Sequence, residues 1–256
     1  MAALLLAATL DFGLRRPRSG AEGAIRIHTW SRRIVEAIGL SFHVAGTPPV
    51  EGAVVSNHLS YLDILLYSAV QPFVMVSKVE VRSWPLLGWL TSQAGTVYVE
   101  RGGAPSTYPG VNRAMAVAYR TGLPVLFFPE GTTTNGSAVL PFRRGLFHSV
   151  LNNHVPLRAA SLRYALTGEN GKATVSDDVC WWGDALFGPH LLRCLGLSGL
   201  RAEIQFDPQE IDGVDRFELA ENAHASVEAL YAGSVWQAGS SSRAEALHPS
   251  ELVQAH

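Results

Sequence analysis

The feature that most constrains the fold is a regular alternation of short apolar runs and helical segments across residues 40–165. Runs such as GAVVSNH and LPVLFFPEG are rich in β-branched and apolar residues and end in polar or turn-forming residues, as strands do. The segments between them, such as SYLDILLYSAV, have helical length and spacing. Strands are expected at 41–46, 52–58, 72–78, 96–101, 123–131 and 154–166, with helices at 60–70, 84–95 and 109–121. This order predicts an α/β fold, with a largely parallel mixed sheet flanked by helices.

The N-terminus carries a short apolar segment with basic residues behind it. The apolar run over residues 2–10 stops at Asp11, and Arg15, Arg16 and Arg18 follow it. It is much shorter than the roughly 20 apolar residues that cross a bilayer. A secretory signal would carry its positive charges before the apolar run. Two interpretations stay open: a segment lying in the membrane interface, and a terminal helix that is frayed or buried.

We expect three regions along the chain. Residues 1–40 form an N-terminal apolar and amphipathic membrane-association region, which includes a helix over 24–40. Residues 41–235 form the α/β domain, which is predicted to close with a helix over 217–231. Residues 236–256 are rich in Ala and Ser and form a flexible tail.

Composition and charge favour an anionic or lipid ligand. Hydrophobic residues make up 47% of the 256 residues, charged residues make up 16%, and the mean hydropathy is +0.13. From Arg101 to Arg163 there are seven arginines and one acid, whereas three arginines and ten acids follow from Arg201 onwards. A basic middle around apolar strands fits an anionic ligand or an anionic lipid surface. Nucleic acid is not expected as a partner, because no basic run or nucleic-acid motif is present.

The cysteine pattern does not predict a disulfide framework or a standard metal site. Cys180 and Cys194 are the two cysteines, with His190 between them. Their spacing matches no standard zinc motif and a fourth ligand is not evident. Two buried thiols in a reducing compartment are expected instead.

Polar residues gather in the segment SNHLSYLD, directly after the apolar run AVV at residues 53–55. In one interpretation Ser60 is the N-cap of the next helix and Asp63 its N3 residue, which makes a capping box. In the other, the turn folds His58 back over the first helical turn. Asp63 then holds one imidazole nitrogen and leaves the other free to act as a base. This segment alone favours the capping box.

Further polar residues follow other predicted strands. Arg101 ends the strand TVYVER, and Glu130 and Gly131 end the strand LPVLFFPEG. Ligands of open α/β sheets gather at the carboxyl ends of the strands. We therefore expect His58, Arg101 and Glu130 to face one crevice.

Together these segments resemble the glycerolipid acyltransferases typified by 1-acylglycerol-3-phosphate acyltransferase. Four blocks of that family match in order over about residues 35–165: HxxxxD at His58 and Asp63, GTVYVER at 95–101, FPEGT at 128–132 and Val155–Pro156. Lesser matches are Lys78, Trp84–Pro85, Gly88 and FRRG at 142–145. Such an ordered set is far more specific than any single motif.

The resemblance implies an O-acyltransferase that moves a fatty acyl group from acyl-CoA or acyl carrier protein to the hydroxyl of a lysophospholipid. It implies His58 as the base, Asp63 as its partner, and substrate binding by Asn57, Arg101, Glu130, Gly131 and Thr132. No cofactor and no metal are expected. We expect 1-acylglycerol-3-phosphate as acceptor and a membrane-associated enzyme of phospholipid biosynthesis. Its expected place is the cytoplasmic face of a bacterial inner membrane.

One departure from the family pattern keeps alternatives open. Many members carry an arginine after EGT as a second phosphate contact, whereas this chain has Thr133; Arg143 or Arg144 is a candidate replacement. The acceptor could therefore be another lyso-lipid, such as lyso-ornithine lipid. The same His–Asp pair could also activate water in a thioesterase, and a non-catalytic lipid-binding protein is a further alternative.

Overall fold

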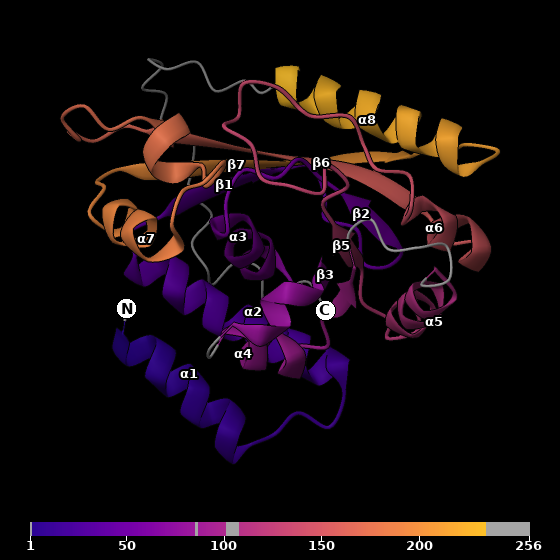
Figure 1. Cartoon of the computed structure of the whole chain (residues 1–256), viewed down its shortest axis with the longest axis horizontal. Helices are drawn as coiled ribbons and strands as arrows, with labels where there is room; N and C mark the ends of the chain where they lie inside the picture. Colours follow the sequence, from indigo (N-terminus) through magenta and orange to yellow (C-terminus); the bar gives the residue numbers. More distant parts are fainter. Residues whose placement is uncertain (1, 85–86, 101–107, 234–256) are drawn as a thin grey trace.

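The computed structural model describes residues 2–84, 87–100 and 108–233. Within these residues, seven strands form one sheet in the order β1-β7-β6-β2-β5-β3-β4. Neighbouring strands are parallel except β6 and β7, which pair antiparallel. Helices lie on both faces of the sheet (Figure 1). The expected α/β fold with a mostly parallel mixed sheet is confirmed.

The elements have the following bounds. The strands are β1 (Ser41–Ala45), β2 (Ala53–Val55), β3 (Val74–Lys78), β4 (Val97–Val99), β5 (Val125–Phe127), β6 (Leu157–Leu166) and β7 (Leu200–Glu210). The α-helices are α1 (Ala2–Leu14), α2 (Gly20–Ala37), α3 (Leu62–Val70), α4 (Leu87–Gln93), α5 (Tyr108–Tyr119), α6 (Phe147–Asn153), α7 (Phe187–Leu195) and α8 (Arg216–Gly233).

The strands β2 and β5 lie in the interior of the sheet and are buried along their whole length. Both consist only of apolar residues, because side chains on both faces of a helix-covered parallel sheet meet other side chains. One apolar cluster joins one face of the sheet to α3, and a second joins the other face to α5, α6 and α8. This double burial fixes the strand ends, and with them the loops that follow.

The N-terminal helices pack as a layer outside α3 and α4 (Figure 1). Phe12 and Ala8 of α1 are buried against Trp30 of α2 and Leu90 of α4. The Trp30 indole N–H donates to the Asp11 carboxylate at 3.0 Å, which ties α1 to α2. One side of α1 is therefore a packed helix, which was one of the two interpretations of this segment.

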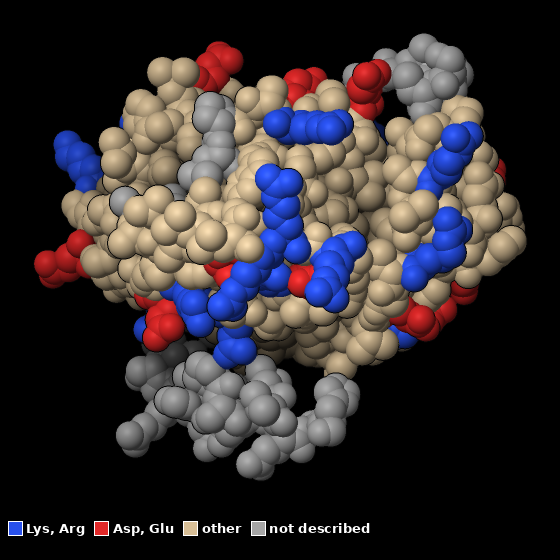
Figure 2. Space-filling view, turned by 90° about the horizontal axis from the view of Figure 1, so that it is seen from below, with Lys and Arg blue, Asp and Glu red and all other residues tan. Residues whose placement is uncertain are grey.

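The opposite side of α1 exposes leucines to solvent. Leu6, Leu10 and Leu14 are 61%, 54% and 83% exposed and recur at every fourth residue, so they form one stripe. Figure 2 views the molecule from the side of α1; this face is mostly uncharged, with Lys and Arg side chains gathered near its middle. None of the described helices is both long and apolar enough to cross a bilayer.

Several elements differ from the sequence expectation. The helix expected from Ser60 begins at Leu62, and the Ser60 hydroxyl is buried without a hydrogen bond, so half of the expected capping box is missing. The long strand β7 and the short helix α6 were not expected. The predicted tail at 236–256 lies outside the described residues.

Candidate active site

The His58 imidazole is held by the carboxylate of Asp63. The chain leaves β2 at Val55 and turns back before α3 begins, so that Nδ1 of His58 lies 2.7 Å from Oδ2 of Asp63. The same Oδ2 accepts the backbone N–H groups of Leu59 and Ser60 at 2.6 and 3.0 Å. Asp63 therefore fixes the turn and holds the imidazole at the same time. The two interpretations of this segment meet in one carboxylate.

The hydrogen bonding determines which imidazole nitrogen can act as a base. Asp63 is fully buried, and its Oδ2 already accepts two backbone N–H groups, so the proton of this contact belongs on Nδ1 of His58. Nε2 is then the unprotonated nitrogen, and His58 lines the cavity described below. The Phe128 ring stacks on the imidazole with centroids 4.0 Å apart and planes 9° apart, which fixes the ring orientation.

Glu130 holds the backbone at the start of the same turn. Its Oε1 accepts the His58 backbone N–H at 2.6 Å, and its Oε2 accepts the Leu140 N–H at 2.9 Å. Burial raises the pKa of Glu130 to about 7, although the two N–H donors oppose that rise. Both oxygens are engaged with the protein backbone, so this geometry indicates that Glu130 positions His58.

Two other residues predicted to bind substrate also have protein partners or lie away from the cavity. Asn57 is buried, and its side-chain amide donates to the Leu162 carbonyl and accepts the Leu162 N–H. It joins the end of β2 to β6, which favours a structural role. Thr132 is exposed and is not among the described residues that line the cavity. Arg101 and Pro85 lie outside the described residues.

Gly131 lines the cavity and makes room for an arginine. Its φ is +71°, a region that favours glycine, and a Cβ here would lie 2.5 Å from Nε of Arg143. The Arg143 side chain thus lies directly over the backbone of the 128–132 block. Its backbone N–H also donates to the Pro129 carbonyl at 2.8 Å.

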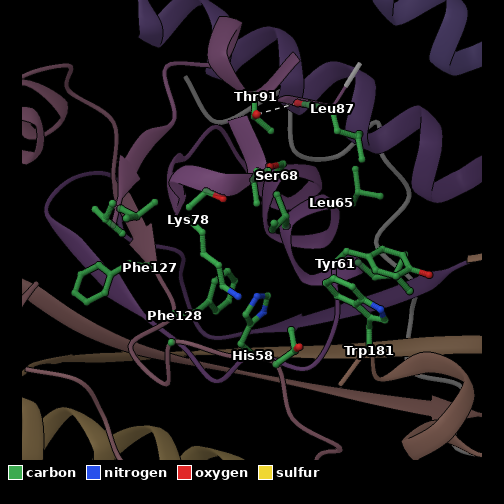
Figure 3. A pocket seen from close by; sticks show the side chains of 18 of the residues that line it. His58, Tyr61, Leu65, Ser68, Lys78, Leu87, Thr91, Phe127, Phe128 and Trp181 are labelled. Atoms are coloured by element: carbon green, nitrogen blue, oxygen red, sulfur yellow. Dashed lines mark hydrogen bonds between the residues drawn. The ribbon is translucent and has the colours of Figure 1, made fainter. Parts of the chain in front are cut away.

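The His58 site opens into a large, mainly apolar cavity of about 1180 Å³. Helices α2, α3, α4 and α7 supply apolar side chains to it. Tyr61, Trp84, Trp181 and Phe187 form an aromatic wall in which each ring contacts at least one other edge-on or tilted. Figure 3 shows His58 between Tyr61 and Trp181 on one side and Phe128 on the other, with Lys78 pointing into the cavity.

Arginines from two further segments line the cavity: Arg143 and Arg144 in the loop before α6, and Arg216 at the start of α8. Arg144 and Arg216 both lie over the Phe217 ring, with guanidinium carbons 4.7 and 5.0 Å from its centroid. Arg144 also lies 3.9 Å from Glu221 of α8. The cavity is therefore apolar where the helices line it and basic at this rim.

The two cysteines are free thiols and both are buried, as predicted. The buried His190 between them contacts the Cys180 carbonyl through Nε2 at 3.0 Å and the Tyr61 hydroxyl through Nδ1 at 3.1 Å. These contacts connect α7 to the aromatic wall. In the part of the chain that the structure describes, no cluster of three or more His, Cys, Asp or Glu residues could hold a metal ion.

Comparison with known proteins identifies the family. The Acyltransferase family model matches residues 47–162. The chain is 35% identical to the lyso-ornithine lipid O-acyltransferase of Pseudomonas aeruginosa, over 77% of this chain and 75% of the relative. It is 32% identical to the 1-acyl-sn-glycerol-3-phosphate acyltransferase of Neisseria meningitidis, over 78% of each chain.

The fold also matches a solved structure. The crystal structure of the 1-acyl-sn-glycerophosphate acyltransferase of Thermotoga maritima superposes with a TM-score of 0.64 at 16% identity, over 93% of this chain and 90% of that one. At this identity the match concerns the fold. Together with the two sequence relatives and the matching family model, these observations show that the chain belongs to the acyltransferase family.

Proposed function

We propose that this protein transfers a fatty acyl group from a thioester donor, acyl-CoA or acyl carrier protein, to the hydroxyl of a lyso-lipid. The observation that carries the proposal is the His58–Asp63 pair in an apolar cavity with a basic rim. Relatives at 35% and 32% identity are named for lyso-ornithine lipid and for 1-acyl-sn-glycerol-3-phosphate. Our first acceptor is 1-acylglycerol-3-phosphate, and lyso-ornithine lipid is the alternative.

His58 is the general base of the proposed reaction. Its Nε2 takes the proton of the acceptor hydroxyl while the hydroxyl oxygen attacks the thioester carbonyl carbon. Asp63 stabilises the imidazolium that forms, and the stacked Phe128 ring adds a favourable cation–π contact. When the C–S bond breaks, the imidazolium returns its proton to the departing sulfur. The products are the acylated lipid and a free thiol, and no acyl-enzyme is formed.

The cavity offers an apolar environment for the acyl chain of the substrate and a basic environment for its head group. The acyl chain lies among the apolar side chains of α2, α3, α4 and α7, where it is removed from water. The anionic head group lies toward Arg143, which the glycine at 131 lets approach the site. Arg143, rather than its neighbour, supplies the positive charge that Thr133 lacks, because Arg144 is engaged with α8. Arg101 is a further proposed contact of the head group.

We propose that residues 1–40 hold the enzyme at a membrane surface. The exposed leucine stripe of α1 enters the interface, and the exposed Arg15, Arg16 and Arg18 attract anionic lipid head groups. Trp30 of α2 and Ala8 of α1 line the cavity, so the helices of this region also contribute to the proposed acyl-chain site. The proposed location is the cytoplasmic face of a bacterial inner membrane.

The test is a panel of acceptors offered to the purified full chain in liposomes. Long-chain acyl-CoA and acyl carrier protein are each supplied with 1-acylglycerol-3-phosphate, lyso-ornithine lipid or lysophosphatidylethanolamine, and lipid products are detected by mass spectrometry. We expect an acylated product from at least one acceptor, and its loss in His58→Ala. Thiol release without any acylated lipid would replace the transferase proposal with the thioesterase.

A further inference from the structure

The two oxygens of the Asp63 carboxylate have different partners. Oδ2 accepts hydrogen bonds from Nδ1 of His58 and from two backbone N–H groups, all in the turn before α3. Oδ1 accepts a hydrogen bond from the hydroxyl of Tyr164 at 2.7 Å; Tyr164 lies on β6, 101 residues away in the sequence. The carboxylate is therefore held from one side by its own turn and from the other side by the sheet.

The Tyr164 hydroxyl can only be a donor in this contact. Its neighbour is a carboxylate whose other oxygen already accepts three hydrogen bonds, so the shared proton lies on the tyrosine. Burial, and then the nearby negative charge of Asp63, raise the pKa of Tyr164 well above its ordinary value. This shift favours the protonated hydroxyl, which is the donor in the contact with Asp63.

We propose that Tyr164 is a positioning residue for the catalytic pair: its hydroxyl fixes the carboxylate plane of Asp63 and, as a hydrogen-bond donor, stabilises the negative charge of this buried group. The inference rests on the proposed role of His58 as the base. Within the part of the chain that the structure describes, Tyr164 is not one of the residues lining the cavity. It acts through Asp63, and nothing in the matched family blocks marks it, because it follows the last block by eight residues.

The direction of the effect follows from the charges of the pair. The active form has a neutral imidazole beside an ionised Asp63, whereas the inactive protonated form is an ion pair. Loss of the Tyr164 donor destabilises the lone carboxylate more than the ion pair, in which the imidazolium compensates its charge. The pair then holds its extra proton up to a higher pH. Activity should consequently fail at a higher pH when the medium is made acidic.

Other ionisable groups also face the pair and stay in place in the test. They are Glu130 in the loop after β5, Tyr67 on α3, Cys180 in the segment before α7, Cys194 on α7, Tyr231 on α8 and Lys78 at the end of β3. Of these, Tyr67 offers a matched control. It is fully buried in the same apolar cluster as Tyr164, but its hydroxyl bonds to Ser56 at 2.6 Å rather than to Asp63.

The test compares Tyr164→Phe with Tyr67→Phe, each of which removes one buried hydroxyl without changing the ring. For Tyr164→Phe we expect kcat to fall about tenfold with little change in KM. We also expect the acid limb of the pH–rate profile to move up by about one pH unit. Tyr67→Phe should leave the acid limb in place, whatever its effect on the melting temperature. An unmoved limb in Tyr164→Phe, or equal shifts in both variants, would overturn the inference.

A second measurement does not depend on turnover. The imidazole of His58 is titrated by NMR in histidine-labelled protein, and its signal is identified by its loss in His58→Ala. The midpoint of this titration should rise in Tyr164→Phe and stay unchanged in Tyr67→Phe. If no lyso-lipid is ever acylated but the midpoint rises, the proposed function fails while the coupling from Tyr164 through Asp63 stands. An unmoved midpoint in folded Tyr164→Phe would refute the coupling itself.

Discussion

His58 is constrained by two segments of the chain, its own turn and the loop after β5. Asp63 holds Nδ1, Phe128 covers one ring face, and Glu130 holds the backbone N–H. Each contact favours one ring orientation, so little conformational freedom is left to lose when substrate arrives. Such preorganisation is how a side chain of ordinary chemistry becomes an effective base.

Glu130 gives the molecule a pH-dependent stability. The pKa of its carboxyl is about 7 in the folded protein, against 4.5 for the free group, because burial disfavours the charged form. Between these values the folded state binds a proton that the unfolded state has released. The contribution of Glu130 to the free energy of unfolding therefore falls as the pH rises from 4.5 through 7, by up to about 3 kcal/mol.

The measurement is urea unfolding of the wild type and of Glu130→Gln at several pH values. Glu130→Gln cannot ionise, so the wild type should lose stability relative to the variant as the pH rises from 5 to 8. The variant should be less stable in absolute terms, because its amide can accept only one of the two backbone N–H groups. Parallel pH curves for the two proteins would contradict the assignment.

At the residue scale, the candidate site residues could be predicted from the sequence, but most of the contacts that hold them in place could not. His58, Asp63 and Glu130 stand in motifs, and the structure brings all three together. Tyr164 is 101 residues from its partner, and no local pattern connects them. Asn57 lies next to His58 in the sequence, yet its side chain points to β6, because successive residues after a strand can face opposite directions.

Helix α2 approaches α4 so closely that only glycine fits between them. A Cβ at Gly23 would lie 1.9 Å from the Gln93 carbonyl oxygen, which belongs to backbone that cannot move aside cheaply. We predict that Gly23→Ala lowers the free energy of unfolding by roughly 1–3 kcal/mol through overpacking. Urea unfolding followed by circular dichroism measures the change.

The matched control is Gly13→Ala in α1. Gly13 is exposed and has no atom within 4 Å of an added Cβ, so alanine there should be neutral or stabilising by up to about 1 kcal/mol. Equal changes of stability in Gly13→Ala and Gly23→Ala would show that the close contact with α4 does not set the cost at Gly23.

The proposed membrane contact of the exposed side of α1 can be tested without an enzyme assay. Replacing Leu6, Leu10 and Leu14 by serine should leave the fold intact, because all three face solvent. It should lower the partition into anionic vesicles at least tenfold, since three large apolar side chains no longer enter the interface. Flotation with phosphatidylglycerol vesicles measures the partition.

A control for this change is an exposed apolar residue outside α1. Val214 is 90% exposed near the beginning of α8, so Val214→Ser removes a comparable exposed side chain away from α1. Its vesicle partition should match the wild type. Unchanged flotation of the triple leucine variant would mean that α1 is not the membrane-contacting element.

At the element scale, periodicity predicted the strands β1 to β6 and most helices, but it failed for β7. The sequence of β7 ends in FDPQE, where Asp207 and Pro208 interrupt the strand pattern. What stabilises β7 is its pairing with two partners, β1 and β6, both distant in the sequence. The seven-residue α6 was also missed, because two turns are too short for a helical period to stand out.

Apolar and basic residues line different parts of the cavity around His58. Apolar side chains of α2, α3, α4 and α7 line much of the cavity, whereas the arginines that line it within the described residues come from the loop before α6 and from the start of α8. In Figure 1, α7 and the beginning of α8 lie toward opposite sides of the molecule. The sequence indicates a basic middle and an apolar ligand separately. Their arrangement around one histidine depends on the tertiary fold, including residues such as Arg216 that lie outside the matched blocks.

The central claim is that the protein, with His58 as the general base, transfers an acyl group from a thioester to a lipid hydroxyl rather than to water. The most direct measurement follows thiol release from acyl-CoA and diacyl lipid formation in the same reaction, with and without the best acceptor of the panel. We expect one thiol per acylated lipid and little release without acceptor. In His58→Ala we expect both signals to fall by roughly a hundredfold or more. Thiol release that is independent of the lyso-lipid, or full transfer activity in His58→Ala, would contradict it.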